Sequence, residues 1–209
     1  MRRDQWIQLL EHHAGEVAAP AMNGADAPRT NAPRTDAPRT NTLAPLPPDP
    51  TLFSGNRSEQ QLWRACAGEV IDPWAAIRPE VGSLLTPDEF LAIEVWAECE
   101  LSAVHALHRL VRERAAKGTE TEPLARRLAD AVRWHLEHTQ PDNSTNRPWA
   151  LHVFLLADDG SGEAALYAET LLHNVLATHA RQEPLSRWIL GDAARELRLI
   201  EASDTFRAG

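Results

Sequence analysis

The sequence contains little cysteine, no long apolar run and no block of basic residues. Only two cysteines occur among its 209 residues. Their wide separation, at Cys66 and Cys99, excludes a CxxC pair, a four-cysteine zinc site and a disulfide framework. The longest uncharged apolar stretch, 149–157, is about half of what a membrane span needs. We therefore expect no membrane-spanning segment.

The net charge of −9 comes without any local cluster of basic residues. Nucleic-acid-binding domains carry such a cluster, so we expect no nucleic-acid partner. All but one of the 21 basic residues are arginine, the exception being Lys117. This preference is typical of GC-rich bacterial genomes and favours a bacterial source.

Signatures of common active sites and cofactor sites are also absent. The chain has no GxGxxG, GxxxxGK[ST], HExxH or GxSxG pattern, and no EF-hand loop. The sequence therefore indicates no cofactor and assigns no enzymatic activity.

Residues 1–19 predict a short amphipathic helix. Its apolar stripe is formed by residues at helical spacing: Trp6, Leu10, His13 and Val17. A helix this short is marginal in water, so we expect it to dock in an apolar groove, and we favour a separate protein partner over the chain's own domain. Gln8 and Glu11 interrupt the apolar residues too early for a secretory signal, which makes the cytoplasm the expected compartment.

Residues 20–50 predict a disordered linker. They hold eight of the 15 prolines, and the pentapeptide Asp/Asn-Ala-Pro-Arg-Thr begins at Asp26, Asn31 and Asp36. Because no large apolar side chain occurs from 23 to 42, burial cannot offset the entropy cost of ordering this segment. We interpret the repeat as a tolerated linker sequence, with a recognition motif as the alternative.

Residues 51–209 predict one all-α domain, which is large enough to be stable without a metal or a disulfide. Thr86-Pro87-Asp88-Glu89 has the pattern of a capping box, at the start of a long helix that ends before Gly118. Apolar periodicity and proline positions predict further helices over 122–139, 146–157, 161–181 and 184–201, and a short one over 59–70. The expected domain thus has about five to six helices.

A weak internal sequence repeat favours stacked helical hairpins. A shift of 39 residues aligns Trp149 with Trp188 and Val132 with Leu171. Periods near 40 residues are typical of α-hairpin repeats. We expect either an α-hairpin repeat or an irregular bundle.

Among residue types with catalytic or metal-binding potential, histidine is the one that is enriched in the predicted helices. His135 and His138 are three residues apart on one predicted helix, and Glu169 and His173 are four apart on another. Each pair therefore shares a helix face, and the four side chains together form a candidate metal site. The alternative is that they are ordinary positions on amphipathic helices.

The polar segment between Pro141 and Pro148 is the second candidate site. We expect that its polar residues, together with one from the following helix, could line a ligand pocket: Asp142, Asn143, Arg147 and His152. The alternative is a well-capped loop between helices that Trp149 anchors in the core.

These observations favour a non-catalytic helical interaction or scaffold protein in a bacterial cytoplasm. The alternative is a ligand-binding or metal-binding protein, or an enzyme, that uses the histidine-rich middle of the chain and the 140–152 loop. The sequence leaves the oligomeric state open.

Overall fold

The computed structural model describes residues 1–15, 56–87, 92–141 and 145–208, with side chains as far as residue 203. The predicted linker 20–50 and the candidate residues Val17, Asp142 and Asn143 lie outside these ranges. The described residues form seven α-helices and two short 3₁₀ helices, without a strand. The predicted all-α fold class is confirmed.

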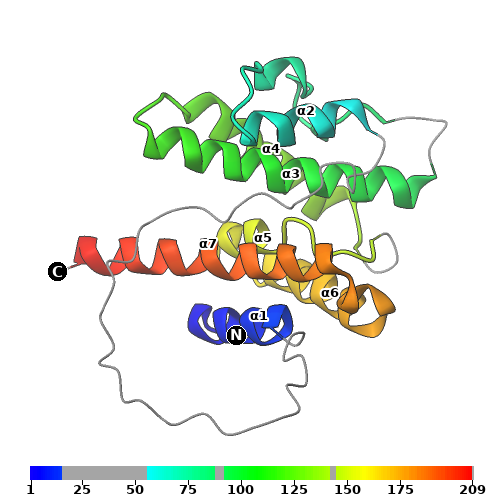
Figure 1. Ribbon diagram of the computed structural model, residues 1–209, viewed down its shortest axis with the longest axis vertical. Coiled ribbons are helices and arrows are strands. Elements are labelled where there is room, and N and C mark those ends of the chain that lie inside the picture. Colours follow the sequence, from blue (N-terminus) through cyan, green and yellow to red (C-terminus); the bar gives the residue numbers. More distant parts are fainter. Residues whose placement is uncertain (16–55, 88–91, 142–144, 209) are drawn as a thin grey trace, which may run out of the picture.

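Helices α2 to α7 form two layers (Figure 1). The first layer contains α2 (Arg57–Cys66), α3 (Ile93–Ala116) and α4 (Glu122–His138), and α3 contacts both neighbours. The second contains α5 (Leu151–Ala157), α6 (Glu163–Ala177) and α7 (Pro184–Ala208). The 3₁₀ helices η2 (Pro73–Ala75) and η3 (His179–Gln182) follow α2 and α6.

The long helix α3 ends where the sequence predicts and begins later. Gly118 adopts a left-handed φ of 70°, and the Thr119 amide bonds back to the Arg114 carbonyl, which closes the helix as expected. The predicted capping box does not start it, because the first helical residue is Ile93, and two residues of the box, Asp88 and Glu89, lie outside the described residues. The carbonyl of Thr86 accepts a hydrogen bond from the Trp96 indole (3.3 Å).

Helix α5 is shorter than the predicted 146–157. It starts at Leu151, because Ala150 has a left-handed φ of 57° that a right-handed helix cannot include. The Ala150 amide donates to Nδ1 of His105 (3.3 Å), which fixes the turn against α3.

Two buried charged side chains fix the irregular segment before α3. The Glu100 carboxylate is fully buried and accepts hydrogen bonds from the amides of Leu84 (2.5 Å) and Leu85 (2.7 Å). Arg127 on α4 donates to the carbonyl groups of Arg78 and Ser83. Backbone groups that no helix satisfies are thereby paired with side chains.

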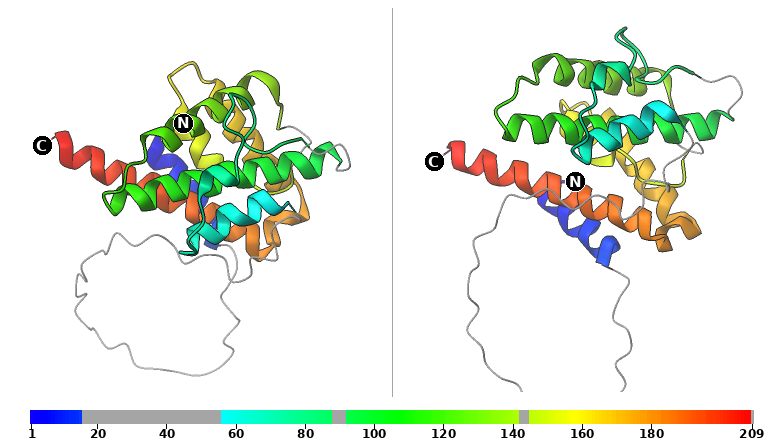
Figure 2. Two further views of the ribbon diagram at one scale, coloured as in Figure 1. Left: turned by 90° about the horizontal axis from the view of Figure 1, so that it is seen from above. Right: turned by 45° about the horizontal axis from the view of Figure 1, so that its top comes forward.

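Helix α1 (Arg3–Gly15) packs along α7, and Figures 1 and 2 both show the two helices side by side. Trp6 and Leu10, two residues of the predicted stripe, are buried there at 3% and 0% exposure, while His13 is half-buried. Glu11 forms an ion pair with Arg198 of α7 (2.5 Å). We expected a separate partner for this helix, and α7 of the same chain takes that place because it offers the apolar surface the stripe needs.

Among the described residues, no helix is both long enough and apolar enough to cross a membrane.

The burial of the tryptophans predicts how much each contributes to stability. Trp149 is 2% exposed, so Trp149→Ala should lower the free energy of unfolding by about 3–5 kcal/mol in urea denaturation. Trp74, which is 40% exposed, is the matched control, and Trp74→Ala should cost less than about 1 kcal/mol. Equal losses for the two variants would contradict the packing of the core.

Candidate functional site

Three helices bury a group of ionisable and polar side chains between the two layers. We call this group the inner cluster, and each member is at most 8% exposed. It comprises three residues of α3, one of α5 and two of α7: His105, His108, Arg109, His152, Asp192 and Glu196. Helical spacing places the α3 residues on one face and the two α7 carboxylates on another, and the two faces meet.

Asp192 is the centre of the inner cluster. Its carboxylate accepts a hydrogen bond from Nη1 of Arg109 (3.1 Å) and lies 3.1 Å from Nε2 of His105. Since Nδ1 of His105 accepts from the Ala150 amide, the ring carries its proton on Nε2 and donates it to Asp192. One carboxylate of α7 therefore binds two side chains of α3.

The surroundings of His105 keep its ring neutral. Trp63, Trp149 and Trp188 surround it, with ring centroids 5.7, 5.5 and 6.0 Å away. Burial among these rings lowers the pKa of His105, and the opposing effect of Asp192 is smaller.

Asp192 itself remains ionised. Burial alone would raise its pKa, but the hydrogen bond from His105 and the nearby positive charges, including Arg109, outweigh this and lower the pKa. Because His105 is neutral, the charge partners of Asp192 are Arg109 on α3, at 3.1 Å, and Arg195 of its own helix, at 3.9 Å.

His152, His108 and Glu196 occupy the other half of the inner cluster. The His152 ring lies 4.6 Å from that of His105 and 4.9 Å from that of His108, between centroids. Neither of its nitrogens has a hydrogen-bond partner among the described residues. Burial, with the neighbouring positive charges as a further cause, holds the pKa of His152 well below the usual histidine value. The Glu196 carboxylate lies 3.6 Å from Nε2 of His108 and 3.4 Å from Nε of Arg112.

The structure does not bring the four candidate metal ligands together. His135 is buried, with Nε2 3.6 Å from the Glu100 carboxylate and Nδ1 3.0 Å from the Thr139 hydroxyl. His138 is exposed and stacks on Trp134, while Glu169 and His173 are exposed on α6. In the part of the chain that the structure describes, no three metal-binding side chains are grouped to hold an ion.

Of the candidate ligand residues in the 140–152 segment, Arg147 and His152 lie within the described residues, and their partners differ. Arg147 forms ion pairs with Glu98 on α3 and with Glu183 (3.0 Å), which immediately precedes α7. His152 belongs to the inner cluster, on the buried face of α5. Arg147, which is half-buried, therefore joins the two layers through its ion pairs.

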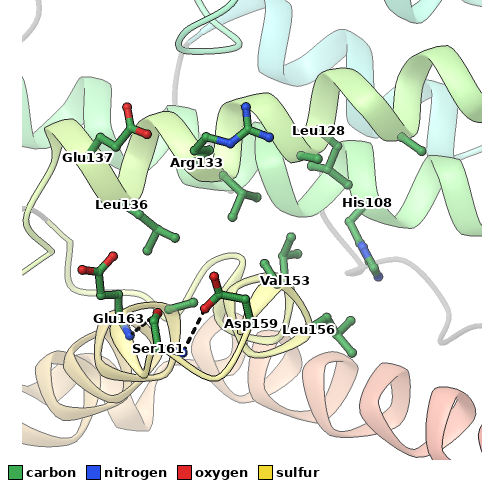
Figure 3. A pocket seen from close by; sticks show the side chains of 15 residues that line it. His108, Leu128, Arg133, Leu136, Glu137, Val153, Leu156, Asp159, Ser161 and Glu163 are labelled. Atoms are coloured by element: carbon green, nitrogen blue, oxygen red, sulfur yellow. Dashed lines mark hydrogen bonds between the residues drawn. The ribbon is translucent and has the colours of Figure 1, made fainter.

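A groove of about 540 Å³ lies between α4 and the α5–α6 region (Figure 3). Its apolar wall comes from α4, α5 and α6: Leu128, Val132, Leu136, Val153, Leu156 and Ala164. A second hollow of about 380 Å³ shares Leu136 and Glu163 with it and extends past Tyr167. His108 is the inner-cluster residue that also lines the groove.

The edge of the groove is acidic. Glu137, Asp159 and Glu163 line it together with Arg133, whose charge is already paired with Asp130 at 3.2 Å. A hydrogen bond from the Ser161 amide lowers the pKa of Asp159, so this carboxylate is charged at neutral pH. The groove therefore combines apolar walls with an excess of negative charge.

Sequence reasoning missed both the groove and the pairing of Asp192. A groove depends on how two layers meet, which helical periodicity does not specify. A signal for the inner cluster is present in the sequence. Asp192 and Glu196 are charged residues that share a helix face with apolar residues of α7, and these apolar residues are buried: Ile189, Ala193 and Leu197.

Comparison of this chain with protein-family models, with curated proteins and with solved structures finds no match.

The buried pairing predicts a large effect of removing the Asp192 charge. Asp192→Asn keeps the side-chain shape but removes the carboxylate that Arg109 contacts, and it should cost about 3–5 kcal/mol in the free energy of unfolding. Asp130→Asn is the matched control, since it breaks an ion pair with the exposed Arg133 and should cost less than about 1 kcal/mol. Urea denaturation of both variants gives the comparison, and similar costs would argue against the buried pair.

The two neutral histidines predict how stability depends on pH. Because burial lowers the pKa of His105 and of His152, the unfolded chain binds protons below about pH 6.5 that the folded chain does not. The free energy of unfolding should therefore fall as the pH decreases from about 6.5 to 5, and this contribution is constant above that range. The contribution of Asp192 is lost only below about pH 4, because its pKa is lowered.

Replacing His152 isolates its share of this pH dependence. His152→Gln should make the slope between about pH 6.5 and 5 shallower, by up to about 1.4 kcal/mol per pH unit. The exposed His138→Gln is the matched control for the substitution, and denaturation series at several pH values measure the slopes. A His152→Gln slope equal to that of the parent chain would refute the assignment.

Proposed function

We propose that this protein is a non-catalytic interaction module whose groove binds a basic amphipathic helix of a partner protein. The observation that carries the proposal is the combination of an apolar groove and an acidic edge along α4 and α6. Amphipathic helices dock by laying their apolar face into such a groove.

The length of the groove favours an elongated partner segment. The two hollows meet at Leu136 and Glu163, so the apolar surface continues along α4 toward its end. Leu166, which lines the second hollow, is 64% exposed and extends this surface outward. Burial of these side chains would supply the apolar part of the binding energy.

The charge at the edge favours a basic partner. Glu137, Asp159 and Glu163 are not balanced by Arg133, because Asp130 already pairs with it. Complementary charge speeds association and excludes acidic partners. Lysine or arginine residues beside the apolar face of the partner helix fit this arrangement.

The inner cluster supports a binding role over a catalytic one. His105 and Asp192 are at most 2% exposed and bind each other, so neither is available to a bound molecule. Of the cluster, His108 reaches the groove, and it is 8% exposed. The cluster therefore serves to hold α3, α5 and α7 together behind the binding surface.

The proposal places the partner surface at the groove instead of at α1, because Trp6 and Leu10 are buried against α7. A bacterial cytoplasm, expected from the sequence alone, is retained as part of the proposal.

Binding of two designed peptides tests the proposed function. The full chain is titrated, with fluorescence anisotropy as the readout, with a labelled amphipathic helix of Leu and Lys and with a matched helix of Leu and Glu. The Leu/Lys helix should bind, and the Leu/Glu helix should bind at least about tenfold more weakly because of the acidic edge.

Two sets of variants locate the binding site. Ala129→Trp places a large ring in the groove from an exposed position and should abolish binding, whereas Ala115→Trp, exposed at the end of α3, should not. Glu137→Gln with Glu163→Gln should weaken binding, and Glu120→Gln with Glu122→Gln is the control for charge alone. Equal effects of both tryptophan variants would contradict the proposal. Binding of dodecylammonium, a small cation with an apolar tail, without binding of the Leu/Lys helix would also contradict it, because the groove would then accept a small molecule and not a helix.

A further inference from the structure

The contact between α1 and α7 is a separate docking surface, on the side of α7 away from α3 (Figure 1). Trp6, Ile7 and Leu10 are at most 3% exposed in it, and Arg198 pairs with Glu11 (2.5 Å). Gly191 faces Ala14 so closely that a Cβ at position 191 would lie 3.6 Å from the Ala14 Cβ. These contacts join two helices from opposite ends of the chain.

The covalent connection does not determine which copy of α7 receives α1. Forty residues, 16–55, separate the described end of α1 from the start of the next described segment. A chain of that length spans at most about 130–140 Å when fully extended. This limit exceeds the size of a domain of this kind, whose radius of gyration is about 16 Å. An α1 helix can therefore reach a second molecule while its own domain stays folded.

The balance between docking within one chain and docking between chains depends on concentration. The α1–α7 contacts are the same in both cases, so they do not favour either one. Docking within a chain gains an effective concentration that falls as the connection lengthens, because closing a longer loop costs more entropy. Reciprocal exchange between two chains forms a closed twofold dimer in which no α1 and no α7 surface is left uncovered.

We infer that α1 exchanges between copies of this protein, so that at high concentration each α1 docks on α7 of a second copy. The surface of α7 that contains Gly191 and Arg198 is thus an interface for a second copy of this chain. This inference goes beyond the proposed function, because the surface is not part of the groove. The exchanged dimer would carry two grooves and could bind a bivalent partner.

Engineered cysteines at the closest point of the interface test the exchange. The distance of 3.6 Å lies within the Cβ–Cβ range of about 3.5–4.5 Å that disulfides adopt. One full-length chain carries Ala14→Cys and a second, larger by an affinity tag, carries Gly191→Cys. The two are mixed at micromolar and at about millimolar concentration, oxidised and separated on a non-reducing gel. The native Cys66 and Cys99 are buried, which limits background reaction.

The expected product is a disulfide-linked dimer of one tagged and one untagged chain, whose yield rises at least severalfold between the two concentrations. The control replaces Ala14→Cys with Gln8→Cys, which lies on the exposed face of α1 and should give little dimer. A single chain carrying both Ala14→Cys and Gly191→Cys should form its disulfide within the monomer at micromolar concentration.

Three results would overturn the inference. The first is a mixed dimer no more abundant than with Gln8→Cys while the double variant closes within its own chain at every concentration. The second is a double variant that forms no disulfide at all. The third is a mixed dimer whose yield is unchanged by adding Trp6→Ala to the Ala14→Cys chain, because that dimer would use another surface.

Discussion

The two layers of this protein depend on one buried carboxylate. Asp192 projects from α7 toward α3, where Arg109 neutralises its charge and His105 completes its hydrogen bonding. A buried charge without such partners would cost several kcal/mol, so the three side chains must be placed together or not at all. Their mutual requirement fixes how α7 is rotated and where it lies along α3. The tryptophans around His105 exclude water and make this requirement stricter.

The position of α7 connects the remaining features. One face carries Asp192 and Glu196 toward the other layer, and the opposite face contacts α1 near Gly191. Polar contacts join the layers along α3, and the groove lies where α4 faces α5 and α6. The interface between the layers is therefore polar along α3 and hollowed along α4.

The sequence predicts the elements well and their assembly poorly. Periodic apolar residues, prolines and Gly118 define both ends of α4 and α6, the end of α3 and the start of α7 to within four residues, because these signals act locally. Helix α3 begins six residues later than predicted, and α7 ends seven residues later. The docking of α1 on its own chain was not predicted. The apolar stripe around Trp6 indicates that the helix needs an apolar groove, but not which molecule provides it. Arg147 and His152 are close in sequence, yet one is half-buried and bridges Glu98 and Glu183 while the other is fully buried. Such differences arise from packing between layers, which a pattern along one chain does not encode.

A double-mutant cycle between the layers tests this account most directly. The free energy of unfolding is measured for the parent chain, Arg109→Ala, Asp192→Ala and the double variant. The account predicts that the double variant is more stable than the sum of the single losses implies, with a coupling energy of about 1–3 kcal/mol. Additive losses, within about 0.5 kcal/mol, would show that the two side chains do not interact and would contradict the account.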